Sequence, residues 1–478
     1  MLPFSNLFYF CSMRHKKKNK YYENIEIESL SSEGLGIARI DDKVVFVENC
    51  IPGDFVNAKT HQVRKSFEKA KLVSLVTPSD VRIPHFCQHF EACGGCKWQY
   101  LPYEKQIAFK EQIVSDAFSR LAKVEVAEKF PILPAIETVY YRNKLEYTFS
   151  TNRWLTREEI EEGKELNKNA LGFHVPGQYT KVVDLEKCYL QDDFSNNLRN
   201  AVRDYAIEHD LAFYEIKVRE GFLRNLVVRT ASTGETLVIL IVNEDNEHLL
   251  PLMEFINESF PQITSLNYII NPKLNDTYMD LEPVCYKGEA FIIEQLGKFK
   301  FKIRPKSFFQ TNTNQGVRLY DIVKDFAALK GDETLYDLYS GVGSIGLYLS
   351  DNCKKLVGIE QVDQAVEDAK ENAKLNGVEN ASFFVGDVRL LLSNEFLNDN
   401  QKPDVLITDP PRGGMHPDVV QTLLDAKVPR IVYVSCNPST QARDIAAMAD
   451  SYKVTKMQAV DMFPHTVHIE NVALLELK

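Results

Sequence analysis

The chain has 478 residues, of which 44% are hydrophobic and 26% charged, and its formal net charge at pH 7 is −11. This is the composition of a globular protein with enough apolar residues for several cores, and the length predicts about three domains. The negative charge excludes a protein that coats nucleic acid through overall basicity, so any RNA binding must use local basic patches. No apolar run approaches the roughly 18 residues of a membrane span.

The N-terminal residues carry an apolar stretch, Met1–Met13, that is followed rather than preceded by basic residues. A signal peptide has the opposite order, with charge before the apolar core. We therefore expect a disordered tail over residues 1–20, or a true start at Met13, and a cytoplasmic protein. The nine cysteines, an odd number with uneven spacing, argue against a disulfide framework.

Residues 21–80 alternate apolar and polar side chains and carry few helix signals. Turn residues such as Gly34, Gly36 and Pro52-Gly53-Asp54 separate the alternating runs. Several short strands in so short a segment predict a small barrel of the oligonucleotide-binding kind, although another small β-domain also fits the pattern. The predicted strands are 25–30, 36–39, 44–47, 55–63 and 70–75.

Three cysteines crowd into one loop with the pattern Cys87-x5-Cys93-Gly94-Gly95-Cys96, whose glycines permit a tight turn. A fourth thiol can come from Cys188. Four thiolates suit either a zinc ion or an iron–sulfur cluster. The spacing differs from the Cys-x3-Cys-x2-Cys loop of radical S-adenosylmethionine enzymes. The residue pattern alone leaves zinc and iron–sulfur equally open.

A helix is predicted over residues 103–122, where apolar side chains recur at helical spacing. Mixed helices and strands without a repeat follow, so residues 81–300 are predicted to form an α+β central domain that contains the cysteines. Near its end, strict alternation predicts a strand with four basic residues on one face. That face is either a charged edge that resists aggregation or a surface that contacts phosphates. The four residues are Lys298, Lys300, Lys302 and Arg304.

Residues 301–478 alternate strands and helices, which predicts a doubly wound α/β domain. Its first strand leads into the turn Gly341-Val342-Gly343-Ser344-Ile345-Gly346, and its second ends at Glu360, a carboxylate suited to ribose hydroxyls. This fingerprint fits a nicotinamide dinucleotide as well as S-adenosylmethionine. Gly386-Asp387 and Asp409-Pro410-Pro411-Arg412 favour the latter, because an Asp-Pro-Pro turn beyond the fourth strand is typical of enzymes that methylate planar nitrogen or carbon centres.

The segment Ser435-Cys436-Asn437-Pro438 follows a buried strand, so a thiol is held where the strand meets a loop. Carbon 5 of uracil becomes nucleophilic when a thiolate adds to carbon 6, and a base must then remove the carbon 5 proton. Cys436 fits the first role, although a buried structural cysteine is an equal alternative. Glu470 is the candidate base in His465-Thr466-Val467-His468-Ile469-Glu470, where a strand glutamate is more often solvated and histidines more often bond locally.

With these motifs, the chain from residue 21 onward resembles the bacterial iron–sulfur RNA 5-methyluridine methyltransferases, most closely those that act on 23S ribosomal RNA. Ser-Phe-Phe-Gln-Thr-Asn at 307–312, the glycine turn, Asp-Pro-Pro-Arg, Ser-Cys-Asn-Pro and His-Thr-Val-His-Ile-Glu occur in the family's order. The resemblance implies a TRAM barrel, an RNA-binding module, over residues 21–80. It also implies a Rossmann-like catalytic domain over 301–478, against which helix 103–122 packs.

The resemblance further implies a role for each candidate residue. Cys436 would be the nucleophile and Glu470 the base, while S-adenosylmethionine and the target base would lie among the remaining polar residues. The implied ligands of a [4Fe-4S] cluster are Cys87, Cys93, Cys96 and Cys188. The implied cofactor-binding residues are Gln310, Tyr339, Gly341, Ser344, Glu360, Asp387 and Asp409, of which Ser344 stands where the family often has asparagine.

The sequence therefore predicts a monomeric enzyme, away from membranes, that methylates carbon 5 of a uridine in structured RNA. Ribosomal RNA is favoured over transfer RNA because the family's transfer-RNA members commonly lack the barrel and the cysteine cluster. An adenine amino-methyltransferase would carry an aromatic residue in place of Arg412, and a 5-methylcytosine enzyme would carry a second cysteine after the prolines. A non-enzymatic iron–sulfur RNA-binding protein would have no need of Cys436 and Glu470 together.

Overall fold

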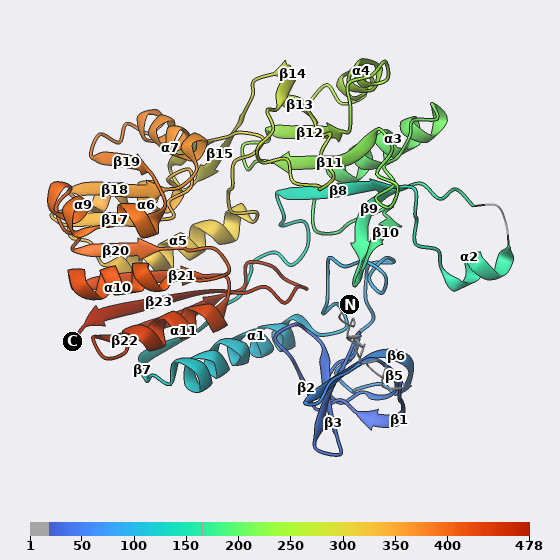
Figure 1. Cartoon of the computed structure of the whole chain (residues 1–478), viewed down its shortest axis with the longest axis horizontal. Coiled ribbons are helices and arrows are strands. Elements are labelled where there is room, and N and C mark those ends of the chain that lie inside the picture. Colours follow the sequence, from blue (N-terminus) through green and yellow to red (C-terminus); the bar gives the residue numbers. More distant parts are fainter. Residues whose placement is uncertain (1–18, 164–165) are drawn as a thin grey trace, which may run out of the picture. The chain divides into compact units, whose positions relative to one another are not determined.

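The structure, a computed structural model, describes residues 19–163 and 166–478, so the expected N-terminal tail lies, except for its last two residues, outside the described residues. The chain forms two compact units (Figure 1). The first contains residues up to Pro84 together with Tyr100–Pro102, and the second contains His85–Gln99 and Tyr103–Lys478. In the described part of the chain, no helix is long and apolar enough to cross a membrane.

The first unit is a six-stranded sheet with the order β1-β5-β6-β4-β3-β2. Its outermost strands, β1 and β2, are separated in the chain only by Ile27 and Glu28, so the sheet must curl until its edges approach each other. Alternate side chains of β4 and β5 are buried inside the curl, as the period-two pattern requires. The predicted barrel is therefore present. Its strands are β1 (Tyr21–Glu26), β2 (Ser29–Leu30), β3 (Gly36–Ile40), β4 (Lys43–Val47), β5 (Phe55–Val63) and β6 (Phe67–Thr77).

The second unit contains a central sheet of seven strands in the order β10-β9-β8-β11-β12-β13-β14. Both faces of this sheet are covered: Val238 and Leu240 of β12 belong to one core, and Ile239 and Ile241 belong to another. The elements are β8 (Lys144–Ser150), α2 (Arg157–Glu162), β9 (Ala170–Val175), β10 (Gln178–Asp184), α3 (Asp193–Glu208), β11 (Leu223–Thr230), β12 (Thr236–Val242), α4 (Leu249–Ser259), β13 (Ser265–Ile270) and β14 (Val284–Gly288).

The C-terminal part forms an eight-stranded sheet in the order β19-β18-β17-β20-β21-β23-β22-β7. Strands β17 to β21 run parallel and β23 runs antiparallel to β21, which is the predicted doubly wound arrangement with one reversed strand. The elements are α5 (Thr313–Ala327), β17 (Thr334–Leu338), α6 (Ser344–Leu349), η2 (Ser350–Asn352), β18 (Lys355–Glu360), α7 (Asp363–Leu375), β19 (Ala381–Val385), α8 (Val388–Leu391), α9 (Asn394–Asp399), β20 (Val405–Thr408), α10 (Pro417–Ala426), β21 (Arg430–Ser435), α11 (Pro438–Met448), β22 (Tyr452–Val460) and β23 (Glu470–Leu477).

A segment that precedes the central sheet in the chain completes the catalytic sheet. Strand β7 (Val126–Leu133) pairs in parallel with β22 at the edge of this sheet. Helix α1 (Tyr103–Ala117) and the turn η1 (Phe118–Ala122) pack against α11, and their apolar residues share its core. The sequence pattern places this segment in the central domain, while the resemblance implies that helix 103–122 packs against the catalytic domain. Its apolar stripe is buried on the sheet that carries the site, as the resemblance implies.

The alternating basic residues lie on and beside β16 (Phe299–Ile303), which forms a hairpin with β15 (Ile292–Leu296). Three of the four side chains form ion pairs. The pairs are Lys298 with Asp351, Lys302 with Glu371 at 3.2 Å, and Arg304 with Asp368 at 2.7 Å and Glu371 at 3.0 Å. These cations hold the hairpin against neighbouring helices, which favours the charged-edge interpretation over a phosphate-contacting face.

Candidate active site

The predicted site residues gather at the carboxyl ends of the parallel strands of the catalytic sheet. Tyr339, Glu360 and Asp409 stand at or directly after the ends of β17, β18 and β20, and the in-register pairing of these strands places the three residues side by side. Ligands bind at this edge of a doubly wound sheet, where the strand order reverses. The topology therefore brings together residues that are dispersed in the sequence.

Backbone N–H groups organise the glycine turn between β17 and α6. Gly341 N–H donates to Glu360 Oε2 at 3.0 Å and Val362 N–H donates to Oε1 at 2.9 Å, so the backbone orients both carboxylate oxygens. Gly346 N–H donates to Oδ2 of buried Asp337 at 2.9 Å, and desolvation raises the pKa of Asp337 to about 7. Since a carboxylate offers about four acceptor sites, Glu360 can accept further hydrogen bonds from a ligand.

Tyr320 of α5 joins two of the predicted cofactor-binding residues. Its buried hydroxyl lies 2.8 Å from Ser344 Oγ and also hydrogen-bonds the Gln310 side chain. The main-chain oxygen of Gln310 accepts a hydrogen bond from Asn143 Nδ2 at 3.0 Å. Tyr320 is indistinguishable from a core residue in the sequence, because its ring falls on the apolar stripe of a helix. In the structure its hydroxyl holds the side chain of Ser344, the first residue of α6.

Asp387 lies at the same edge, two residues beyond β19. Its Oδ1 caps α8 by accepting the N–H of Arg389 at 2.9 Å, and the Arg389 guanidinium lies 3.4 Å from Oδ2. Tyr339 is half-buried in the left-handed region with φ +63. Burial raises the pKa of its phenol to about 12, with the carboxylate of Asp387 as a further cause. Asp387 and Tyr339 are thus neighbours at this edge of the sheet.

Strand register sets Cys436 opposite Glu470. Strands β21 and β23 are antiparallel and Ser435 pairs with Asn471, so the next residue along each chain in this register is Cys436 on one side and Glu470 on the other. Glu470 is buried and Cys436 is partly exposed. The thiol and the carboxylate therefore share the end of the ladder, at the edge that carries the glycine turn.

Burial and nearby charges shift the pKa values of Cys436, Glu470 and Asp409. Burial and the carboxylates of Glu470 and Asp409 raise the pKa of the Cys436 thiol to about 11, while the charge and hydrogen bond of Arg412 act against that rise. Burial, with Asp409 as the second cause, raises the pKa of Glu470 well above its usual range, and Arg412 again opposes the shift. Burial also raises the pKa of Asp409 to about 7. The guanidinium of Arg412 therefore acts on two of these three acidic groups, Cys436 and Glu470.

Arg412 is positioned by contacts from two other segments. Its carbonyl oxygen accepts hydrogen bonds from Asn437 Nδ2 at 3.1 Å and Thr440 Oγ1 at 3.2 Å. Its Nη2 lies 3.2 Å from His468 Nδ1. Burial and the charge of Arg412 lower the pKa of His468 to about 4, so the ring is neutral at pH 7 and Nδ1 can accept from the guanidinium. His468 thus orients Arg412.

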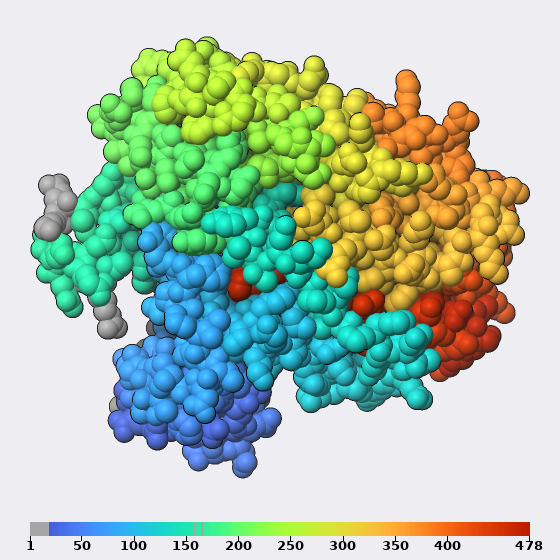
Figure 2. Space-filling model, turned by 180° about the vertical axis from the view of Figure 1, so that it is seen from behind, coloured from blue at the N-terminus to red at the C-terminus, as the bar shows by residue number. Residues whose placement is uncertain are grey.

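His465 connects the catalytic segment to the cysteine loop. Its N–H donates to Gln106 Oε1 at 2.9 Å, and its carbonyl oxygen accepts from the N–H groups of Lys97 at 2.7 Å and Trp98 at 3.1 Å. Gln106 Nε2 donates in turn to the carbonyl of Trp98 at 3.0 Å. Figure 2 shows red atoms of the C-terminal part of the chain surfacing among cyan atoms. His465 therefore serves as a structural junction.

The four predicted cysteine ligands lie together. Burial raises the pKa of each thiol, and the charge of Cys188 raises those of Cys87, Cys93 and Cys96 further. Gly95 N–H donates to Cys93 Sγ at 3.4 Å, and neighbouring N–H groups lower the pKa of the other three thiols. Within residues 19–163 and 166–478, no group of three or more His, Cys, Asp or Glu side chains is arranged to hold a metal ion. The donor set suits thiolate ligands, because N–H groups stabilise charged sulfur.

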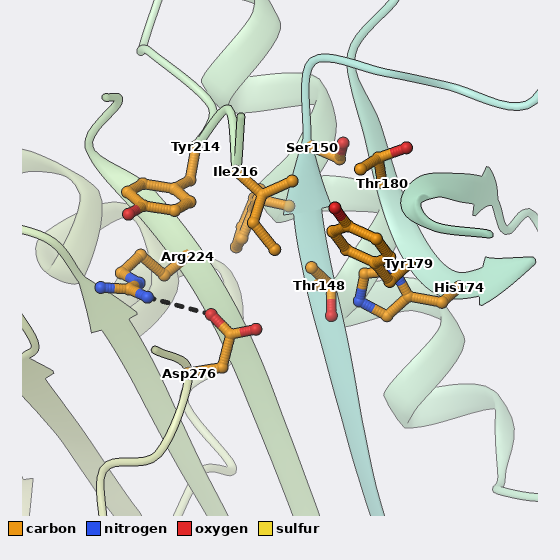
Figure 3. A pocket seen from close by; sticks show the side chains of 10 residues that line it. Thr148, Ser150, His174, Tyr179, Thr180, Tyr214, Ile216, Arg224 and Asp276 are labelled. Atoms are coloured by element: carbon orange, nitrogen blue, oxygen red, sulfur yellow. Dashed lines mark hydrogen bonds and ion pairs between the residues drawn. The ribbon is translucent and has the colours of Figure 1, made fainter. Parts of the chain in front are cut away.

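A separate pocket lies on the central sheet and is lined by residues of β8, β9, β10 and β11 (Figure 3). Arg224, only 1% exposed, lies at one side of it with its guanidinium centre 4.3 Å from the centroid of the Tyr214 ring. The guanidinium donates to Asn271 O at 2.7 Å and to Asp276 Oδ1 at 2.9 Å. These bonds hold both terminal nitrogens of the guanidinium within the protein, whereas its buried Nε has no hydrogen-bond partner. None of the predicted site residues lines this pocket.

The fold and the polar residues at its strand ends define an enzyme of the methyltransferase class. Residues 289–478 match the tRNA (Uracil-5-)-methyltransferase family, and residues 16–73 match the TRAM domain. An RNA methyltransferase of Bacteroides thetaiotaomicron is 50% identical over 454 residues, which cover 94% of this chain and 100% of the relative. An RNA methyltransferase of Porphyromonas gingivalis is 47% identical over 461 residues, with 94% and 99% covered.

A solved structure is similar over the same length. The tRNA (uracil-54, C5)-methyltransferase of Pyrococcus abyssi, in complex with S-adenosyl-L-homocysteine, superimposes with a TM-score of 0.73 and 30% identity. The alignment covers 95% of this chain and 100% of the archaeal chain. The chain therefore belongs to the RNA methyltransferases of the uracil-5 type that carry a TRAM domain.

The roles of Arg412 and His468 were not assigned from the sequence. Both residues stand in the quoted motifs, Arg412 three positions after Asp409 and His468 two before Glu470. The alternation of a strand entry places His468 and Glu470 on the same side, which was the available signal. The sequence carries no signal for the contact between Arg412 and His468, because 56 positions separate these two residues.

Replacing Arg412 with Gln should slow alkylation of Cys436 by iodoacetamide in mildly alkaline buffer. Loss of the cation should raise the thiol pKa above its value of about 11, and each unit of pKa lowers the thiolate fraction about tenfold. Peptide-resolved mass spectrometry across a pH series measures the rate at Cys436. Arg120→Gln, which alters an exposed arginine of η1, is the matched control. An unchanged pH profile for Arg412→Gln would contradict the assigned role.

Proposed function

We propose that this protein transfers a methyl group from S-adenosylmethionine to carbon 5 of a uridine in structured, cytoplasmic RNA. The observation that carries the proposal is the register of β21 and β23, which sets Cys436 opposite Glu470 at the ligand-binding edge of the sheet. Membership of the uracil-5 family supports the reaction type. Because one chain supplies every candidate residue, we also propose that the enzyme acts as a monomer.

The proposed cofactor site is the glycine turn and the neighbouring strand ends. Bound S-adenosylmethionine would supply the electrophilic methyl group. Glu360 is oriented by two backbone N–H groups and can accept from ribose hydroxyls, while Asp387 can accept from an adenine amino group. The residues that would hold the cofactor and the reacting base are Gln310, Tyr339, Gly341, Ser344, Glu360, Asp387 and Asp409.

Cys436 is the proposed nucleophile. Its thiolate would form a bond to carbon 6 of uracil, which moves an electron pair toward carbon 5 and lets that carbon take the methyl group. Arg412 favours the thiolate, because its charge and hydrogen bond lower the pKa of the thiol. Asp409 lies within electrostatic reach of both Cys436 and Glu470, and with its pKa near 7 it can exchange a proton with the uracil edge.

Glu470 is the proposed general base. Its carboxylate would remove the proton from carbon 5, after which the bond between carbon 6 and sulfur breaks and Cys436 leaves as a thiolate. Burial raises the pKa of Glu470, which makes its carboxylate a stronger base for this step. The neutral ring of His468 is too weakly basic to compete, since its pKa is about 4.

Two variants separate these steps. Cys436→Ala should abolish 5-methyluridine formation and retain S-adenosylmethionine binding, whereas Glu470→Gln should accumulate a covalent protein–RNA complex, because addition proceeds and proton removal fails. Denaturing gels and calorimetry measure these outcomes, with total RNA from a strain that lacks the gene as substrate. Glu476→Gln, on the same strand, is the matched control. Substantial turnover by Cys436→Ala would refute nucleophilic catalysis.

We propose 23S ribosomal RNA as the substrate and transfer RNA as the second candidate. The first follows from the resemblance of the motifs. The second is favoured by the Pyrococcus abyssi enzyme, because a protein named for transfer RNA is similar to this chain over its whole length. Because the alignment covers 95% of this chain, it extends into the barrel, so the barrel does not by itself discriminate between the two substrates.

Mapping of 5-methyluridine in a deletion strain distinguishes the two substrates. We expect one or more 5-methyluridines to disappear from 23S ribosomal RNA and to return when the intact gene is restored, while a gene encoding Cys436→Ala should not restore them. Mass spectrometry of nuclease fragments detects the change. Loss confined to transfer RNA would assign the second candidate.

We propose that Cys87, Cys93, Cys96 and Cys188 bind a [4Fe-4S] cluster with a structural role. The support is that the four thiols are neighbours and that N–H groups beside each of them act to lower its pKa, against the effect of burial. The preference for a cluster over zinc comes from the resemblance of the motifs.

Protein purified without oxygen should contain about four iron and four sulfide ions per chain and absorb broadly in the visible range. Cys188→Ser should lower both the iron content and the absorbance. Cys285→Ser, which removes an exposed cysteine outside the group, should change neither. A colourless protein with one zinc ion per chain would contradict the proposed cluster.

A further inference from the structure

Three aromatic side chains form an exposed cluster beside the cysteines, here called the aromatic platform: Phe86, Tyr140 and Tyr189. Phe86 and Tyr140 are each 42% exposed, and Tyr189 is partly exposed. The rings of Phe86 and Tyr189 meet edge to face with centroids 5.2 Å apart, and those of Tyr140 and Tyr189 are 6.1 Å apart. Large aromatic side chains that contact one another yet remain in water mark interaction surfaces.

The backbone holds the platform in a fixed shape. Tyr140 has a φ of +56°, a region that bulky residues rarely adopt. Its N–H donates to Tyr189 O at 2.7 Å, and Arg142 N–H donates to Leu190 O at 2.8 Å, so two hydrogen bonds tie the strained segment to its neighbour. Strained non-glycine residues of this kind concentrate at functional sites, where the surroundings enforce the conformation. The platform is therefore preorganised.

A cation lies beside the exposed rings. The Nζ atom of Lys187 is 5.4 Å from the centroid of the Tyr189 ring and 5.9 Å from that of Tyr140. The same ammonium pairs with Asp193 at 3.1 Å, and its side chain stays 41% exposed. An ammonium next to partly exposed aromatic rings matches a nucleotide, whose base can stack on a ring while its phosphate lies near the charge.

The platform adjoins both the cysteines and the segment that carries the proposed base. Phe86 directly precedes Cys87, and Tyr189 directly follows Cys188. On its other side, the Phe86 ring meets the ring of His465 at 5.1 Å. Because His465 belongs to the same short segment as Glu470, an RNA strand that reaches the active site would pass close to these rings.

We propose that the aromatic platform stacks an unpaired base of the RNA substrate near the target uridine. The inference rests on the proposed function, because a uridine that leaves its stack to reach Cys436 also exposes its neighbours in the strand. Stacking on aromatic faces tolerates any base, so the platform would hold the strand and leave the choice of uridine to other contacts. The cation beside the rings favours nucleic acid over an apolar protein partner.

The test uses full-length Cys436→Ala protein and a short oligouridylate that carries one 2-aminopurine, whose fluorescence falls when the base stacks. We expect quenching on binding. Tyr140→Ala should lose the quenching and bind about tenfold more weakly, since a stacked base contributes on the order of tenfold or more to affinity. Tyr140→Phe should retain both, because the ring and not the hydroxyl stacks.

Tyr179→Ala is the matched control, since it removes a tyrosine that is 72% exposed but lies outside the platform. Phe86→Leu, which keeps an apolar contact with His465, provides a second platform variant if Tyr140→Ala unfolds at a lower temperature. Quenching that survives in both platform variants, or that is lost equally in Tyr179→Ala, would overturn the inference.

The outcome separates this inference from the proposed function. If the Cys436→Ala protein quenches the probe through the platform but protein with Cys436 intact forms no 5-methyluridine, the platform stands and the proposed function fails. If 5-methyluridine forms and the probe is never quenched, the platform alone is refuted.

Discussion

A buried ion pair fixes the start of the segment from which the proposed base emerges. Lys110 Nζ and Asp461 Oδ1 lie 2.6 Å apart, and both side chains are fully buried. Asp461 also accepts from the Tyr103 hydroxyl at 2.9 Å and from the N–H of Phe463 at 3.1 Å, so its charge is well satisfied. Breaking a buried pair typically costs about 3–5 kcal/mol, whereas apolar replacement of both partners can be neutral. We therefore interpret the pair as a device that positions the segment, more than as a source of stability.

After Asp461 the chain enters β23, and the pairing of β23 with β21 determines which residue lies opposite Cys436. A shift of one residue would turn Glu470 to the opposite face of the sheet and separate it from Cys436. The register also gathers three acidic groups in a largely buried place, where the charge of Arg412 acts on Cys436 and Glu470. His468 then matters because it holds Arg412 in position at 3.2 Å.

The elements that the sequence predicts well are those with local signals. Alternation in residues 21–80 predicts the barrel strands, and the glycine turn with Glu360 predicts the ligand-binding edge, because each depends on neighbours in the chain. Contacts between distant segments carry no such signal. Lys110 and Asp461 are 351 positions apart, and nothing in the helical pattern around Lys110 distinguishes it from a solvated residue. The placement of β7 in the catalytic sheet was missed for the same reason, since an edge strand is defined by its partner.

The junction at His465 explains how a cysteine cluster can serve a reaction that transfers no electrons to a metal. Its carbonyl accepts the N–H groups of Lys97 and Trp98, which directly follow Cys96, and its ring meets Phe86, which directly precedes Cys87. If the cysteines bind a cluster, its assembly orders both flanks of the loop and therefore fixes His465 from two sides. The same residue is held from a third side by Gln106 of α1. Order in the loop is thus transmitted through the backbone to the segment that carries the proposed base, and no change of redox state is required.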